Sequence, residues 1–157
     1  MKLSDILVEA NVIAALTAPD KLGVLRELAE HLTAHNALGA LSTGDVQAAL
    51  LEREHLGSTG VGQGVAIPHA RLPNLAQLVA VFGRSPGGIE FDAIDQQPVS
   101  LFFMLLVPES SAGVHLKALS RIARLLKNDD FRRRLNTLAD RPSLYHALTE
   151  EDALVGP

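Results

Sequence analysis

The stretch that most restricts the fold of this chain runs from Val99 to Val107 and is apolar at every position except Ser100. A strand with one covered face alternates apolar and polar residues, whereas a strand covered on both faces is apolar almost throughout. The run is closed by Pro108 and is far too short to span a bilayer as a helix. The sequence therefore predicts a central strand with a layer of chain on each side.

Helical patterns lie on both sides of this strand in the chain. Capping residues and apolar spacing predict helices over about residues 20–35, 42–55, 112–127 and 128–138, and a short last helix that begins at 140–143. The first helix is expected to start from a capping-box variant at Thr17–Asp20. Its apolar face is expected to comprise Leu22, Leu25, Leu28, Ala29 and Leu32.

Further strands are predicted at residues 65–67, 75–84 and 88–92, with a turn at 86–88. The chain lacks the regular strand–helix–strand alternation of a doubly wound fold. This order of elements predicts an α/β fold, a three-layer α/β/α sandwich around a mixed β-sheet. We see no linker that would divide the chain, so residues 1–157 are expected to form a single domain.

The composition excludes several classes of protein. The 157 residues carry a net charge of −4, whereas a nucleic-acid-binding surface needs a clustered basic face. The chain has no cysteine, which excludes disulfides, thiolate catalysis and cysteine metal sites. The N-terminal residues show no apolar signal-peptide core. We therefore expect a cytoplasmic protein with no membrane insertion, no nucleic-acid partner, no cofactor and no metal.

His69 is the first candidate for chemistry because the backbone around it is restricted. It follows the short stretch Val65–Ile67 and then Pro68, which fixes its own φ and favours an extended preceding residue. An imidazole held on such a backbone loses little entropy on reacting. A lone histidine is more often structural, but this setting favours a nucleophile.

A glycine-rich segment, Gly60-Val-Gly62-Gln-Gly64, precedes that stretch. It does not fit a dinucleotide-binding loop, because here a helix precedes the glycines and a strand follows them. Such a turn can present backbone N–H groups to an anion. The hydroxyls of Ser58 and Thr59 could add donors, or they could equally make local caps. Candidate phosphate contacts are Ser58, Thr59, Gly62 and Gly64.

Two further side chains are candidates for holding an anion near His69. His115 lies in the first turn of its predicted helix, where free N–H groups favour phosphate, and a half-buried packing role is the alternative. Arg53 lies near the end of the second predicted helix, and its guanidinium suits either phosphoryl oxygens or a neighbouring glutamate. The pair His31 and His35 has no acidic cluster nearby and is expected on a solvated face.

Three blocks of sequence are distinctive. They are Glu54 with Val61-Gly62 and Val65-Ala-Ile-Pro-His69-Ala70; His115-Leu-Lys-Ala-Leu119 with Ile122-Ala123; and Gly88-Ile-Glu-Phe-Asp92-Ala-Ile-Asp-Gln-Gln-Pro-Val99 with Leu105-Leu-Val-Pro108. With these residues, essentially the whole chain resembles the type-2 (mannitol/fructose) enzyme IIA family of the bacterial phosphoenolpyruvate-dependent phosphotransferase system. The third block looks like the nitrogen-regulatory branch of that family.

This resemblance implies that Nε2 of His69 accepts a phosphoryl group from an HPr-like protein, while His115 and Arg53 hold the group. It also implies mainly regulatory, nitrogen-related output through partners such as transporters and kinases. The alternatives are a sugar-specific (fructose/mannitol) component that passes phosphate to a IIB domain, and a purely binding regulatory module. The sequence contains no IIB segment, which favours the regulatory output.

Overall fold

The apolar run at 99–107 forms β6 (Val99–Pro108), the central strand of a mixed sheet in the computed structural model, which describes residues 1–35, 38–111 and 113–156. One edge of β6 pairs antiparallel with β5 (Val79–Ile89), and β1 (Val12–Ile13) lies parallel to β5 beyond it. The other edge pairs in parallel with β3 (Val65–Ala66) and then β4 (His69–Leu72). Antiparallel β2 (Gly60–Gly62) completes the sheet beside β3.

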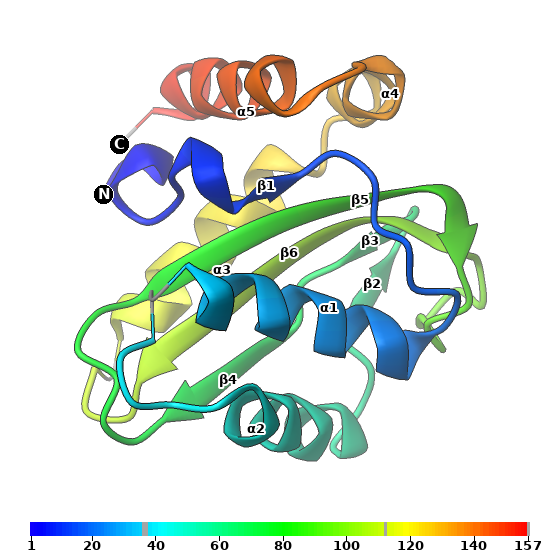
Figure 1. The fold of residues 1–157 in the computed structure, drawn as a ribbon. Coiled ribbons are helices and arrows are strands. Elements are labelled where there is room, and N and C mark those ends of the chain that lie inside the picture. The colour runs from blue at the N-terminus through cyan, green and yellow to red at the C-terminus, as the bar shows by residue number, and fades with distance from the viewer. Residues whose placement is uncertain (36–37, 112, 157) are drawn as a thin grey trace.

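Helices cover both faces of this sheet, as the apolar character of β6 requires (Figure 1). Phe102, Met104 and Leu106 belong to the core under α1 (Lys21–Ala34) and α2 (Thr43–His55). The alternate residues Leu101, Phe103 and Leu105 belong to a second core. That core is closed by α3 (Val114–Leu125), α4 (Asp129–Thr137) and α5 (Arg141–Val155). The predicted three-layer α/β/α sandwich is confirmed.

Capping side chains define most helix starts as expected. Ser42 accepts a hydrogen bond from the amide of Asp45 in a capping box, and Asn128 and Asp140 cap α4 and α5. The first helix is capped by Asp20 and not by the capping-box variant expected from Thr17, because the amides of Thr17 and Ala18 donate to the Glu27 carboxylate instead.

Four other expectations about the elements are wrong. Leu22 is 53% exposed and lies off the buried face of α1. The strand predicted at 75–84 begins at Val79 and continues through the expected turn at 86–88, because a register shift with Gly88 at a φ of +74° lets Ile89 pair again with Val99. The last helix runs to Val155 and is not short. The predicted start of the third helix at Ala112 lies outside the described residues.

The N-terminal segment, for which no local pattern predicts a structure, packs against the face that carries α3 and α5 (Figure 1). The Asp152 carboxylate accepts a hydrogen bond from the amide of Leu3 at 2.7 Å and pairs with Arg121 at 2.5 Å. Nowhere in the described ranges is a helix both long enough and apolar enough to cross a membrane.

Candidate active site

A cavity of about 490 Å³ opens between α2, β4 and the start of α3. Its polar lining contains the two histidines His69 and His115 and the two arginines Arg53 and Arg71. The remaining lining residues are mostly apolar and are Ala49, Glu52, Leu56, Ala70, Leu105, Val107, Leu116 and Leu119. The structure thus brings His69, Arg53 and His115 together, although they are far apart in sequence.

The backbone of His69 is fixed by the sheet. The residue begins β4 and is paired with Leu105 of the central strand, whose amide donates to the carbonyl of Pro68 at 2.9 Å. The short strand β3 ends at Ala66, so Ile67 and Pro68 form the break that turns the chain into β4. The imidazole is half-buried and faces the cavity.

Two contacts determine which nitrogen of His69 carries the proton. Nε of Arg53 lies 3.3 Å from Nε2 of His69, and a guanidinium can only donate, so Nε2 must accept. Nδ1 lies 2.9 Å from the carbonyl oxygen of Ile67, so it is the nitrogen that donates. The neutral ring therefore keeps its proton on Nδ1 and directs the Nε2 lone pair into the cavity, as a nucleophile requires.

The surroundings also keep this imidazole neutral. Burial lowers the pKa of His69 from its usual 6.5, and the positive charge of Arg53 and the neighbouring His115 ring act in the same direction. The Ile67 carbonyl and the Glu54 carboxylate oppose this effect and are outweighed by it. At neutral pH the Nε2 lone pair is therefore available.

We expect the ring of His69 to titrate with a midpoint below 6.5 in a ¹H–¹⁵N NMR experiment on the ring nitrogens, because burial disfavours the charged form. Below that midpoint the protonated ring has no lone pair and cannot react. Above it, the spectrum should show the neutral form protonated on Nδ1. A midpoint above 6.5, or a neutral form protonated on Nε2, would contradict the assignment.

Arg53 comes from the last turn of α2, and its side chain is fixed from two directions. Besides Nε2 of His69, it binds the carbonyl of Gly57 through Nη1 at 2.8 Å. That carbonyl belongs to the segment that leaves the helix, so Arg53 also closes the end of α2. A guanidinium beside the nucleophilic nitrogen offers further N–H donors to an oxyanion bound there.

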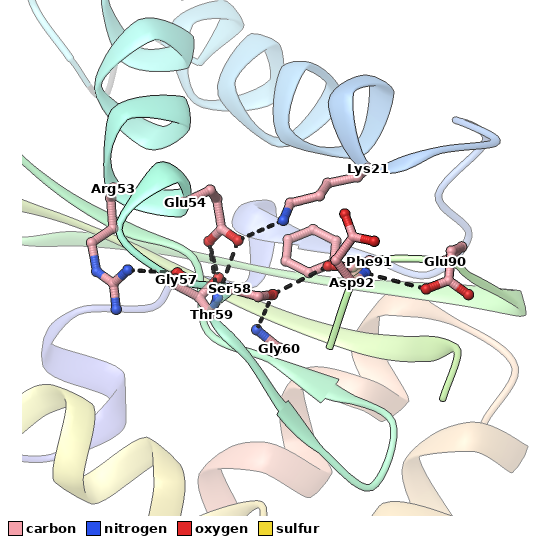
Figure 2. A network of polar contacts seen from close by, with 10 residues as sticks. All are labelled: Lys21, Arg53, Glu54, Gly57, Ser58, Thr59, Gly60, Glu90, Phe91 and Asp92. Atoms are coloured by element: carbon pink, nitrogen blue, oxygen red, sulfur yellow. Dashed lines mark hydrogen bonds and ion pairs between the residues drawn. The ribbon is translucent and has the colours of Figure 1, made fainter. Parts of the chain in front are cut away.

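A buried carboxylate next to Arg53 anchors this end of α2, as Figure 2 shows. Glu54 forms an ion pair with Nζ of Lys21 at 3.0 Å and accepts hydrogen bonds from the Thr59 amide at 3.1 and 3.2 Å and from the Thr59 hydroxyl. Lys21 also lies 4.7 Å from the centre of the Phe91 ring. The network ties α1, α2 and the start of β2 together. Glu54 belongs to the sequence motif, but its position in that motif could not show that Lys21 and Thr59 are its partners.

The four residues expected to contact phosphate do not line the cavity. Ser58 donates to the carbonyl of Phe91 at 3.2 Å and accepts from the amide of Gly60, while Thr59 binds Glu54 (Figure 2). Gly62 and Gly64, with φ values of +99° and +79°, shape the turn between β2 and β3. Both hydroxyls therefore bind local groups of the chain, as the alternative expected: that of Ser58 binds Phe91 and Gly60, and that of Thr59 binds Glu54. These four residues are therefore left out of the phosphoryl contacts proposed below.

His115 lies in the first turn of α3, as predicted, and is half-buried on the cavity side. Its neighbour there is Arg71, which sequence reasoning missed: Nη2 of Arg71 lies 3.1 Å from Nε2 of His115. A signal was available, because residues two apart in a strand point to the same face, and Arg71 follows His69 by two positions.

The pair His31 and His35 lies away from the cavity, on α1. The expectation of a solvated face is wrong for His31, whose half-buried ring has Nε2 at 2.6 Å from the carbonyl of Ala10. Burial lowers the pKa of His31 as a consequence. Among the described residues, no three His, Cys, Asp or Glu side chains gather as metal ligands.

Residues 5–151 match the sequence profile of the family described as phosphoenolpyruvate-dependent sugar phosphotransferase system, EIIA 2. The chain belongs to this family. This IIA domain is 41% identical to the nitrogen regulatory protein of Bradyrhizobium diazoefficiens over 151 residues, which cover 94% of this chain and 95% of the relative. The crystal structure of nitrogen regulatory protein IIA-Ntr from Neisseria meningitidis is also similar, with a TM-score of 0.87, 37% identity and coverage of 94% of this chain and 99% of that one.

A sugar-specific protein is also among the relatives of this IIA domain. The fructose-specific EIIABC component of Bacillus subtilis is 32% identical over 97% of this chain, which spans only 24% of that protein. The family therefore supports a role in a phosphotransferase system, and its relatives include both nitrogen regulatory and fructose-specific proteins.

Proposed function

We propose that this IIA domain is a phosphocarrier in which Nε2 of His69 accepts a phosphoryl group from an HPr-like protein. The observation that supports this most strongly is the state of the ring: Ile67 holds the proton on Nδ1, and Nε2 faces Arg53 in an open cavity. A neutral imidazole whose Nε2 carries no proton and lies beside a guanidinium is suited to covalent capture of a phosphoryl group.

In the proposed step, the N–P bond of the donor phosphohistidine breaks as Nε2 of His69 bonds to phosphorus. The donor imidazole leaves with the bonding electron pair, and His69 keeps its Nδ1 proton. The domain has to position the two nitrogens in line and stabilise the charge on the transferred oxygens. Arg53, whose Nε lies 3.3 Å from the accepting nitrogen, supplies that stabilisation.

The proposed output is mainly regulatory, through binding of partner proteins such as transporters and kinases. Leu56 and Leu116, at 82% and 62% exposure, lie among the cavity residues and give the site an apolar rim. A phosphoryl group adds about two negative charges, which favours some partners and weakens others. The nitrogen regulatory relative that matches nearly the whole chain supports this output.

The second candidate is a sugar-specific IIA component that passes the phosphoryl group to a IIB domain. It is favoured by the similarity to the fructose-specific EIIABC component. The two functions share the phosphorylation of His69 and differ in the acceptor. Rapid loss of the phosphoryl group to an added IIB domain would favour the second.

The test of the shared step is intact-protein mass spectrometry after incubation with phosphoenolpyruvate, enzyme I and an HPr-type carrier. We expect one phosphoryl adduct that is lost in acid, as a phosphorus–nitrogen bond requires. Absence of an adduct, with a donor shown to be phosphorylated, would overturn the phosphocarrier proposal and leave a purely binding regulatory module.

Arg53→Ala is expected to slow transfer from the carrier about tenfold or more, because a charge-assisted hydrogen bond to the phosphoryl oxygens is lost. The variant also loses the contact with the Gly57 carbonyl, so its unfolding midpoint has to be measured alongside. Quench-flow kinetics give the rate. A folded variant with unchanged transfer and an unchanged lifetime of the phosphorylated form would remove Arg53 from the phosphoryl contacts.

His115→Ala is expected to fold and to transfer phosphoryl more slowly, by a factor of about ten, since one donor to the oxyanion is removed. The ring is half-buried at the edge of the cavity, so little packing is lost. The same kinetic measurement applies. If the rate matched that of the wild type, His115 would have only a packing role.

A further inference from the structure

Arg71 is a cationic residue of the cavity that neither the sequence motif nor the proposed step uses. We propose that Arg71 is a second phosphoryl-binding residue, which His115 holds in place while His69 is unphosphorylated. The inference rests on the proposed function, because it concerns the group that His69 receives. It assigns to this chain a two-arginine clamp in place of a single guanidinium.

The strand places Arg71 on the reacting face. Side chains alternate along β4, so Ala70 and Leu72 enter the core beneath α1 and α2, while His69 and Arg71 face the cavity. Residues two apart on one strand face are separated by about 7 Å, within reach of an arginine side chain. Arg53 approaches from α2, so the two guanidinium groups come from different elements.

The contact with His115 holds the Arg71 guanidinium at the cavity without neutralising it. Nη2 lies 3.1 Å from Nε2 and 3.4 Å from Nδ1 of the His115 ring. A guanidinium only donates, so this contact requires an unprotonated ring nitrogen and leaves the charge of Arg71 uncompensated. Such a contact is easily exchanged for a stronger one to a phosphoryl oxygen.

The charged side chains around the cavity favour an anion, because two arginines, Arg53 and Arg71, face one carboxylate, Glu52, in its lining. Within the described ranges, neither Arg53 nor Arg71 forms an ion pair with a carboxylate, whereas Arg26, Arg121 and Arg132 do. A phosphoryl group on His69 brings about two negative charges to this place. Two arginines would compensate the charge of this group. Each arginine can also bind two oxygens of one phosphoryl group at once.

In the proposed exchange, Arg71 leaves the His115 ring and donates N–H groups to the phosphoryl oxygens as they arrive. Arg71 neither gains nor loses a proton in this exchange. The only covalent changes are that the N–P bond of the donor breaks and that the bond between phosphorus and Nε2 of His69 forms. The consequence is greater stability of the phosphorylated form. It is measurable as the equilibrium of the phosphoryl group between the HPr-like carrier and this domain.

The experiment measures that equilibrium constant for the wild type, Arg71→Gln, Arg71→Lys and the control Arg133→Gln. Arg133 is an exposed arginine of α4 that does not line the cavity, so its replacement removes the same charge elsewhere. We expect Arg71→Gln to shift the equilibrium about tenfold toward the carrier, as loss of a charge-assisted hydrogen bond implies. Arg71→Lys should shift the equilibrium less than Arg71→Gln does, because lysine keeps the positive charge but lacks the planar guanidinium. The control should match the wild type.

A second measurement distinguishes a direct contact between Arg71 and the phosphoryl group from an effect of the substitution on the fold. In NMR spectra of the arginine Nε–H groups, phosphorylation of the wild type should move the signals of Arg53 and Arg71 and leave that of Arg26, on α1, in place. An unchanged Arg71 signal, an Arg71→Gln equilibrium equal to that of the wild type, or an equal shift in Arg133→Gln would overturn the inference and leave the proposed function intact. A wild type that takes up no phosphoryl group would overturn both.

Discussion

His69→Ala is expected to take up no phosphoryl group at all while keeping the fold. The substitution removes the nitrogen whose lone pair faces Arg53, in a ring whose proton the Ile67 carbonyl holds on Nδ1. The hydrogen bond to the Ile67 carbonyl is lost as well, at a cost of about 1 kcal/mol in the free energy of unfolding. Mass spectrometry after incubation with the carrier measures uptake, and circular dichroism with a urea titration measures the fold.

His146→Ala is the matched control, because His146 is an exposed histidine of α5 that pairs with Glu150 and lies outside the cavity. It should be phosphorylated like the wild type. An adduct on His69→Ala would move the acceptor to another residue, with His115 the first to be examined. Loss of the adduct from both variants would show that histidine replacement acts through something other than the acceptor.

Glu54→Ala is expected to lower the free energy of unfolding by about 3 kcal/mol. Its carboxylate is the shared partner of Lys21 and of both hydrogen-bond donors of Thr59, and it is 9% exposed. Removing one member of a buried ion pair leaves the other charge and the buried amide without their partner. The loop that follows α2 would also loosen, so a slower phosphoryl transfer through Arg53 is expected in the same variant.

Glu30→Ala provides the comparison for this loss. Glu30 pairs with Arg26 on the exposed side of α1 at 2.7 Å, and both side chains are more than half exposed, at 52% and 65%. Exposed pairs of this kind contribute less than about 1 kcal/mol. Urea unfolding of both variants gives the difference. Equal free energies of unfolding would mean that the Glu54 network does not stabilise the fold.

The layered architecture was predictable because it follows from one strand. A run that is apolar on both faces has to be covered on both faces, and the structure divides its residues between two cores accordingly. The short elements were not predictable. The two-residue strand β1 and the turn at Leu3 are held by distant partners, Phe82 of β5 and Asp152 of α5, which no local pattern reveals.

The candidate site was predictable where the local sequence fixes the backbone. Pro68 and the strand after it orient His69, and helix phase places Arg53 and His115 on inward faces, so the three side chains meet. Their roles in phosphoryl transfer remain predictions. Ser58 and Thr59 illustrate the limit, because a hydroxyl in a loop can bind a ligand or its own chain. Only the positions of Phe91 and Glu54 show that these two bind the chain.

The most direct measurement is heteronuclear NMR of the phosphorylated protein with ¹⁵N-labelled histidine. The tautomer held by Ile67 and Arg53 predicts that phosphorus couples to Nε2 of His69 and that Nδ1 keeps its proton. Coupling to Nδ1 of His69, or to a ring nitrogen of another histidine, would contradict the proposed chemistry of the site.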